Sequence, residues 1–292
     1  MSQAAIRPSA LRPGIVADLH THSTCSDGRL SPEAIIDRAL ALGLRGLSIT
    51  DHDNLAGSTR AAAYLRTLRE SGSVPEDFIF VPGIELSTST EGRDVHLLVY
   101  WPRSTGRELA CLLADAEERR RERALRIVDL LAEDGWPVSR ESFLATGLKP
   151  NRPNVARVLI ESGRAPSVDW CFGHLFNDGC PYHVPRFEVD TCEAIRVALR
   201  AGGVPVVAHP AHYRCEQWIE RFSRAGLEGM EAWHSLQTAQ DATRLIAVAH
   251  RLGLAVSGGS DWHGDTVHSA TLGGVGLTAP EFSEFLKLKP QE

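Results

Sequence analysis

The sequence has few of the features that mark membrane-spanning or disulfide-rich proteins. No stretch approaches the roughly 20 consecutive apolar residues that a bilayer-spanning helix needs, and the first residues lack the apolar core of a secretory signal. The six cysteines are scattered and form no Cys-x-x-Cys pair, which disfavours a disulfide framework and a zinc ribbon. We therefore expect a cytoplasmic protein with reduced thiols and no membrane contact.

Positive charge is also scarce. The chain has 31 Lys and Arg against 37 Asp and Glu, a formal net charge of -6, which argues against a large basic face that grips long nucleic acid. Bound divalent cations would offset the acidic residues locally, so a small anionic substrate is compatible with this charge. The chain contains neither a Gly-x-x-x-x-Gly-Lys-Ser/Thr loop nor a Gly-x-Ser-x-Gly elbow, which disfavours ATP-driven enzymes and serine hydrolases.

Short apolar runs alternate with helical stretches along most of the 292 residues. This rhythm predicts βα units, a mostly parallel sheet and one main α/β domain. Ser31 and Pro32 predict the start of one helix and Gly43 its end. The predicted strands are 15–22, 46–52, 78–86, 95–101, 204–209, 229–234 and 255–263, and further helices are predicted at about 58–70, 191–201, 216–225 and 238–252.

The rhythm is interrupted between residues 105 and 189. This segment is rich in helical patterns, at 107–133 and 154–162, with glycine and proline breaks between them. We predict that it forms a small helical cap inserted into a barrel domain made of residues 14–104 and 190–285. Because the insertion follows the fourth predicted strand, we expect its ends to emerge at the rim where the strands end, and the cap to cover that rim.

Histidines and carboxylates gather at the predicted strand ends. In Asp18-Leu-His20-Thr-His22 the two imidazoles are two residues apart, so a strand's period of two points both to one side. A single His-x-His is weak evidence, but six of the seven predicted strands carry such a side chain at or near one rim, where α/β barrels place their working groups. The predicted metal ligands are His20, His22, Asp27, His52, Glu85, His96, His209, Asp261 and His263.

Nine ligands exceed the coordination of one ion, so we predict a cluster of about two to three divalent cations. Mixed imidazole and carboxylate ligation suits Mn²⁺, Zn²⁺ or Fe²⁺. Such a cluster suits metal-assisted hydrolysis, because a hydroxide bridging two ions attacks while the ions share the charge that develops. Phosphate esters are the natural substrates, but the ligand pattern alone also allows an amidohydrolase or deaminase.

The successive motifs resemble those of the PHP (polymerase and histidinol phosphatase) family. They are Asp18-Leu-His-Thr-His-Ser-x-x-Ser-Asp-Gly28, Ile49-Thr-Asp-His-Asp53, Gly83-Ile-Glu-Leu-Ser87, His96, Ala208-His-Pro210 and Gly259-Ser-Asp-Trp-His263. The resemblance is closest to stand-alone phosphoesterases with a helical insertion that act on nucleotides or RNA 5′ ends. It implies a distorted (β/α)7 TIM-like barrel with a trinuclear metal centre.

The resemblance also implies how the ligands divide among the ions. Four residues would hold the first ion: His20, His22, Glu85 and Asp261. Asp27, His52 and His263 would hold the second together with Glu85, which bridges the two. His96 and His209 would hold the third. Glu85, Asp261 and His263 are thus the predicted catalytic residues. The sequence differs from these relatives at Ala211-His212, where they often carry Gly-Arg.

Other residues are predicted to support the site. Asp18 and Asp53 are expected to orient ligand imidazoles, although loop or capping roles would explain them as well. Arg152, His212 and His234 are candidate substrate contacts, with ordinary surface or core roles as the alternative. The predicted partner is a small phosphorylated substrate, a nucleotide or a short RNA; no protein partner can be inferred. Besides an amidohydrolase, the remaining alternative is a non-catalytic barrel like the PHP modules attached to polymerases.

Overall fold

The computed structural model describes residues 13–102, 107–185, 189–264 and 270–290. The chain divides into two compact units, the first made of residues 1–111 with 189–292 and the second of residues 112–188. The border predicted between residues 104 and 105 lies outside the described residues. Among the described residues, no helix is long and apolar enough to cross a membrane.

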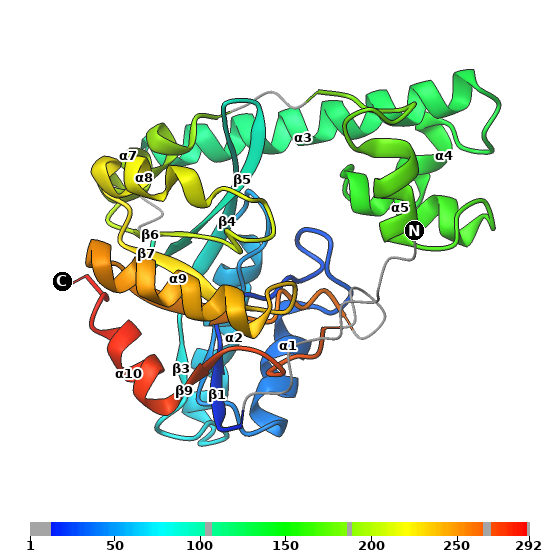
Figure 1. Ribbon diagram of the computed structural model, residues 1–292. Coiled ribbons are helices and arrows are strands. Elements are labelled where there is room, and N and C mark those ends of the chain that lie inside the picture. The colour runs from blue at the N-terminus through cyan, green and yellow to red at the C-terminus, as the bar shows by residue number, and fades with distance from the viewer. Residues whose placement is uncertain (1–12, 103–106, 186–188, 265–269, 291–292) are drawn as a thin grey trace. The chain divides into compact units, whose positions relative to one another are not determined.

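The first unit contains two sheets, most of whose strands are labelled in Figure 1. One sheet has the order β3-β2-β1-β9 and the other the order β4-β5-β6-β7-β8. Strands and helices together confirm the predicted α/β class. The strands are β1 (Ile15–Asp18), β2 (Gly46–Leu47), β3 (Ile79–Phe80), β4 (Gly83–Thr90), β5 (Arg93–Tyr100), β6 (Val204–Val207), β7 (Gly229–His234), β8 (Ala255–Gly259) and β9 (Leu277–Thr278).

The sheets are less uniformly parallel than the sequence pattern predicted. β1, β2 and β3 pair in parallel, as do β6, β7 and β8. By contrast, β5 runs antiparallel to both β4 and β6. Glu91 and Gly92 join β4 to β5, with φ of 53° and 77°. Two consecutive residues at positive φ are typical of a type I′ turn, which closes a two-residue hairpin and leaves no room for a crossover helix.

This hairpin corrects one expectation about the insertion. Tyr100, the last residue of β5, pairs with Gly83 at the start of β4, so the chain leaves β5 at the end opposite to the predicted rim. The chain comes back from the insertion at the other end of β4, because Asp190 forms a bridge with Ser89 near the end of that strand. Only one of the two ends of the insertion therefore emerges where both were expected.

Hydrogen bonds beyond the regular ladders link the two sheets on both sides. Thr21, just after β1, bridges Trp262, just after β8, and the Leu19 amide donates to the Gly258 carbonyl at 3.2 Å. On the other side, His52 bridges Glu85 of β4. The C-terminal halves of several predicted strands are therefore irregular segments that are joined by single bridges. These segments carry most of the predicted ligands.

Helices cover the sheets, and several begin and end where the sequence predicted. Ser31 accepts a hydrogen bond from the Ala34 amide at 3.2 Å, Pro32 is the first helical residue, and Gly43 follows the end of α1 with φ of 71°. α10 was not predicted. The helices of this unit are α1 (Pro32–Ala41), α2 (Ala56–Glu70), α7 (Thr191–Arg200), the short η2 (Glu216–Trp218), α8 (Ile219–Ala225), α9 (Ala239–Leu252) and α10 (Ala279–Leu286).

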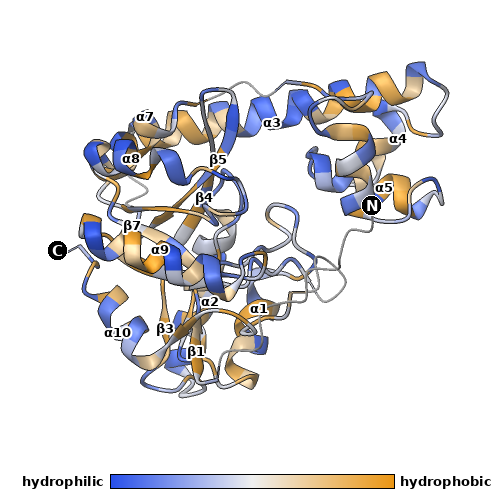
Figure 2. Cartoon of the chain, in the orientation of Figure 1, coloured by the Kyte–Doolittle hydropathy of each residue, from blue (hydrophilic) through white to orange (hydrophobic). Residues whose placement is uncertain are grey.

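Two apolar clusters hold the first unit together. Ile35 of α1 packs with Leu65 of α2 and Leu47 of β2, and a second cluster joins Leu98 of β5 and Phe285 of α10. In Figure 2, β1 and β3 have hydrophobic colours while α8 is mostly hydrophilic. Fully burying each such side chain contributes about 1.5–3 kcal/mol, which fixes the strands whose ends carry the site.

The second unit is helical throughout its described part. Its own core contains Leu131, Phe143, Leu159 and Phe176, each at most 2% exposed. The predicted helices at 107–133 and 154–162 correspond to two of its elements. The elements are α3 (Arg107–Glu133), whose first residues belong to the first unit, α4 (Arg140–Ala145), α5 (Arg152–Glu161), α6 (Val168–Cys171) and the π-helical turn η1 (Phe172–Phe176).

Candidate metal centre

His20 and His22 follow β1 and point into one buried site. Both side chains are fully buried. The Nε2 atoms of His20 and His22 lie 3.3 and 3.1 Å from the same oxygen of Asp261, and 3.4 and 3.3 Å from the same oxygen of Glu85. The backbone places two imidazoles on one side, as the two-residue spacing predicted. The carboxylates of Glu85, from β4, and of Asp261, from the segment after β8, lie beside them.

Glu85 of β4 lies at the centre of the site. Its carboxylate is 1% exposed, yet five imidazoles surround it. Because one side chain reaches all five, it is placed to join neighbouring cations. The distances are 2.8 Å from His96 Nδ1 and 3.2 Å from His209 Nε2 to Oε1, and 3.0 Å from His52 Nδ1, 3.3 Å from His22 Nε2 and 3.4 Å from His20 Nε2 to Oε2.

A second set of imidazoles surrounds the carboxylate of Asp27. One of its carboxylate oxygens lies 3.3 Å from His263 Nε2 and 3.7 Å from His22 Nδ1, and the other lies 3.8 Å from His52 Nε2. The rings of His22 and His263 stack at 4.1 Å between centroids. His22 thus lies between the surroundings of Asp27 and those of Glu85, so the two carboxylates belong to one continuous site.

The donor atoms of the site are close enough to hold cations. They form four groups, and the donor atoms within each group lie within 4.8 Å of one another. Both ring nitrogens of His22, together with His20 Nε2, His209 Nδ1 and Glu85 Oε2, are buried and make no hydrogen bond. Buried polar atoms left in this way are costly unless they bind a ligand. The residues therefore fit divalent metal ions. The groups are His20 with His209, Glu231 and His234; His22 with Asp27, His52 and His263; His20 with His22 and Glu85; and His52 with Glu85 and His96.

The electrostatics of the site favour positive charge. Burial alone would raise the pKa of Glu85, but the imidazoles of His96, His52 and His20 hold it well below its usual range. Burial likewise opposes protonation of His22, yet the adjacent carboxylates of Asp261 and Glu85 raise its pKa to about 10. The buried negative charges of the carboxylates therefore favour bound cations. Without a metal, protonated imidazoles neutralise these charges.

Two of the predicted ligands have unusual backbone geometry. Asp261 and His209 have φ of 54° and 29°, in the left-handed region that side chains other than glycine rarely adopt. Gly259 approaches His20 so closely that a Cβ on it would lie 2.4 Å from the His20 Cβ. Such local strain, of order 1–3 kcal/mol for a residue, clusters at functional sites.

The two predicted orienting residues contact the backbone near the ligands. The carboxylate of Asp18 accepts hydrogen bonds from the amide and hydroxyl of Ser260 and from the amides of Gly273 and His20. Asp53, itself at φ of 54°, accepts one from the Ser87 amide at 2.7 Å. Asp18 therefore ties the end of β1 to the loop after β8 through hydrogen bonds to backbone amides and the Ser260 hydroxyl.

The three candidate substrate contacts lie in different surroundings. His234 is buried, with Nε2 3.4 Å from Asp261, while its Nδ1 accepts a hydrogen bond from the Leu236 amide. His212 is exposed, its ring 5.9 Å from that of His209. Arg152 belongs to the second unit, where its guanidinium carbon lies 4.9 Å from the centre of the Phe172 ring.

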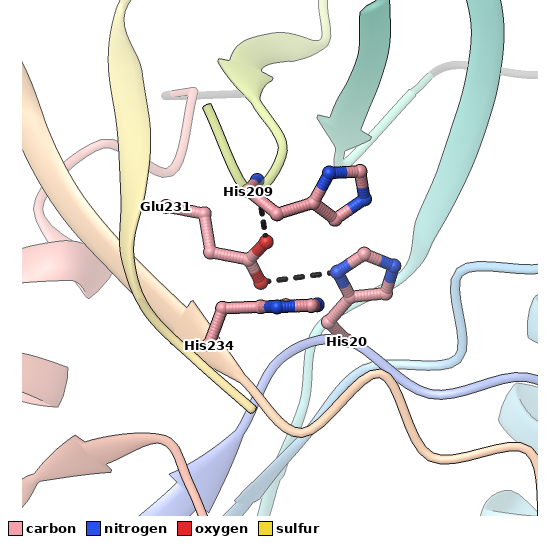
Figure 3. Close-up of side chains that lie close together, drawn as sticks. All are labelled: His20, His209, Glu231 and His234. Carbon is pink, nitrogen blue, oxygen red and sulfur yellow. Dashed lines mark hydrogen bonds and ion pairs between the residues drawn. The ribbon is translucent and has the colours of Figure 1, made fainter. Parts of the chain in front are cut away.

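Sequence reasoning missed Glu231, which the structure places among the imidazoles. Figure 3 shows it with His20, His209 and His234. It is fully buried in β7, and its carboxylate contacts His20 Nδ1 at 3.0 Å. A signal for it existed, because an acidic residue within an apolar strand is almost never fully buried unless paired.

Comparisons with known proteins agree with this geometry. A model of the PHP domain matches residues 18–119. The chain is 33% identical over 256 residues to the 5′-3′ exoribonuclease Rnm of Escherichia coli, covering 85% of each chain. It is 31% identical to a 3′,5′-nucleoside bisphosphate phosphatase of Chromobacterium violaceum, covering 84% of this chain and 86% of the relative. The solved structure of a metal-dependent phosphoesterase from Bifidobacterium adolescentis, assigned as such without proof of activity, superposes with a TM-score of 0.83 at 28% identity, over 94% of this chain and 96% of the other.

Proposed function

The chain belongs to the PHP domain family, and from this premise we propose that it is a divalent-metal-dependent phosphoesterase acting on nucleotides or the 5′ ends of short RNA. The observation that carries the proposal is the convergence of five imidazoles on the buried carboxylate of Glu85. Because imidazoles lie beside both of its oxygens, the Glu85 carboxylate is suited to bridge two cations that these imidazoles bind. Binding site and family point to the same chemistry.

We further propose that the two sheets form a distorted (β/α)7 barrel. The bridges between Thr21 and Trp262 and between His52 and Glu85 support this, because they join the sheets on both sides. In this arrangement seven chain segments surround the ligands, and each segment supplies its side chains from the same rim. β3 pairs with β2 just before β4 bridges the segment that follows β2, and β9 pairs with β1.

About two to three ions of Mn²⁺, Zn²⁺ or Fe²⁺ would be held by the predicted ligands. His20, His22, Glu85 and Asp261 would hold one ion, Asp27, His52, His263 and Glu85 a second, and His96 and His209 a third. The grouping of donor atoms from His20 and His22 with Glu85, and from His52 and His263 with Asp27, supports the first two sets. When bound, the ions would supply an acidified water and charge neutralisation for phosphoryl oxygens.

The chain's own residues would orient the substrate. Because the Leu236 amide donates to His234 Nδ1, neutral His234 carries its proton on Nε2, which faces the site. His234 is therefore placed to donate a hydrogen bond to a substrate oxygen and is poorly suited to bind a metal through that atom. The buried walls would exclude water from the reacting ester, which strengthens each charged contact.

Nucleotides are the proposed substrate class because relatives covered over most of their length have names that specify RNA and nucleoside bisphosphates. The test is to assay the full chain, loaded with Mn²⁺ or Zn²⁺, on adenosine 3′,5′-bisphosphate, AMP, a 5′-phosphorylated short RNA and a panel of amides. We expect phosphoester hydrolysis that a chelator abolishes and added metal restores. Metal analysis should find about two to three equivalents. Amide hydrolysis with no activity on any phosphoester, or the absence of bound metal, would overturn the proposal.

A further inference from the structure

Glu231 contacts two of the predicted metal ligands at once. Its Oε1 lies 3.0 Å from His20 Nδ1, and its Oε2 accepts a hydrogen bond of 2.9 Å from the backbone amide of His209 (Figure 3). His20 comes from the end of β1 and His209 from the turn after β6. The side chain is fully buried, so these two contacts take the place of the water that its carboxylate loses on folding.

The contact with His20 determines which nitrogen of that ring faces the site. A carboxylate only accepts hydrogen bonds, so His20 must carry a proton on Nδ1. In the neutral ring this leaves the lone pair on Nε2, the atom that lies near Glu85 and Asp261. Metal-binding histidines usually donate their second ring nitrogen in this manner, which fixes the tautomer and orients the ring.

The contact with His209 stabilises an unfavourable backbone. His209 has φ of 29°, and the following turn is held by Gln237, just after β7, because the Ala211 amide donates to Gln237 Oε1 at 3.0 Å. Gln237 in turn donates to the carbonyl oxygens of Glu231 and Ala232. The turn that presents His209 is therefore fastened to the end of β7 by two buried side chains.

We propose that Glu231 is a positioning residue that fixes His20 Nε2 toward the metals and holds the backbone of His209, so that one carboxylate aligns ligands of two ions. This inference rests on the metal centre under the proposed function. Glu231 belongs to one of the four donor groups, but each of its oxygens already accepts a hydrogen bond, one from an imidazole N–H and the other from a backbone amide, which favours positioning over direct ligation.

Glu231→Gln tests the requirement for two acceptors with almost no change in shape. An amide has one oxygen, so in either orientation its NH₂ group faces a donor, the His20 Nδ1–H or the His209 N–H. We expect the affinity for Zn²⁺, measured by competition with a chromophoric chelator, to fall by about 10- to 100-fold. Glu228→Gln is the matched control, since Glu228 directly precedes β7, is half-buried and lies outside the ligand groups. It should bind Zn²⁺ like the wild type.

The outcomes separate this inference from the proposed function. If the wild type binds no metal, the proposed function fails together with the positioning role. If wild type and a folded Glu231→Gln bind Zn²⁺ with equal affinity, only the positioning role is overturned. Circular dichroism shows whether the variant is folded.

A second measurement needs no variant. A crystal structure of the Zn²⁺-loaded wild type should show His20 bound through Nε2, with its Nδ1 within hydrogen-bond distance of Glu231. Zinc bound through His20 Nδ1, or zinc within about 2.2 Å of a Glu231 oxygen, would overturn the positioning role.

Discussion

Replacing Glu85 with glutamine should nearly abolish activity without disturbing the fold. The side chain keeps its size, so no cavity forms, but one of its two oxygens becomes an NH₂ group that cannot bind a metal. Two imidazole nitrogens lie within 3.2 Å of Oε1 and three within 3.4 Å of Oε2. Either orientation of the amide therefore removes the metal ligand on one side and the negative charge on both.

The expected loss follows from the charge that metals stabilise. Metal ions contribute several kcal/mol of transition-state stabilisation, and about 4 kcal/mol corresponds to about 10³-fold in rate. We therefore expect kcat/KM of Glu85→Gln on a nucleotide substrate to fall by at least about 10³-fold, with the loss of at least one equivalent of metal. Circular dichroism and thermal unfolding of the metal-free protein check the fold, and Glu228→Gln serves again as the control. A folded variant with wild-type turnover and full metal content would refute the bridging role of Glu85.

Three further predictions concern the same site. Asp261→Asn should be nearly as damaging as Glu85→Gln, because one Asp261 oxygen lies within 3.3 Å of both His20 and His22; unchanged metal content and kinetics would show that it is not a ligand. Metal binding at pH 7 should release at least about one proton, since the pKa of His22 is raised to about 10 and a ligand imidazole must be neutral. Affinity should accordingly fall as the pH is lowered, and calorimetry in two buffers of different ionisation enthalpy would detect the release; identical heats would contradict it. Gly259→Ala should destabilise the protein by about 1–3 kcal/mol or more, because its new Cβ would lie 2.4 Å from the His20 Cβ; denaturant unfolding with a wild-type midpoint would count against that close approach.

The sequence was most informative where local chemistry decides the structure. The cap at Ser31 and the left-handed Gly43 set the limits of α1 without help from distant residues. The direction of β5 depends on the turn before it, and the Glu91-Gly92 pair was a usable signal because glycine readily adopts positive φ. It was overlooked because the apolar runs on either side of it also fit separate βα units.

The ligand types were readable because histidines and acids recur at strand ends, but their mutual contacts were not. The spacing of His20 and His22 placed both imidazoles on one side. No spacing relates Glu231 to His20, because they lie 211 residues apart and meet only through the arrangement of β1 and β7. For the same reason the partners of Asp18, the Ser260 amide and hydroxyl, could not be read from the sequence.

The antiparallel β5 has a consequence for how the segment between Tyr100 and Asp190 can be removed. The chain departs beside Gly83, where Tyr100 pairs, and returns beside Ser89, where Asp190 pairs. These points are separated by six residues of β4, or roughly 20 Å at about 3.4 Å per residue. A tight turn cannot splice them. A protein shortened between these two points would need a linker of about six extended residues laid along the sheet.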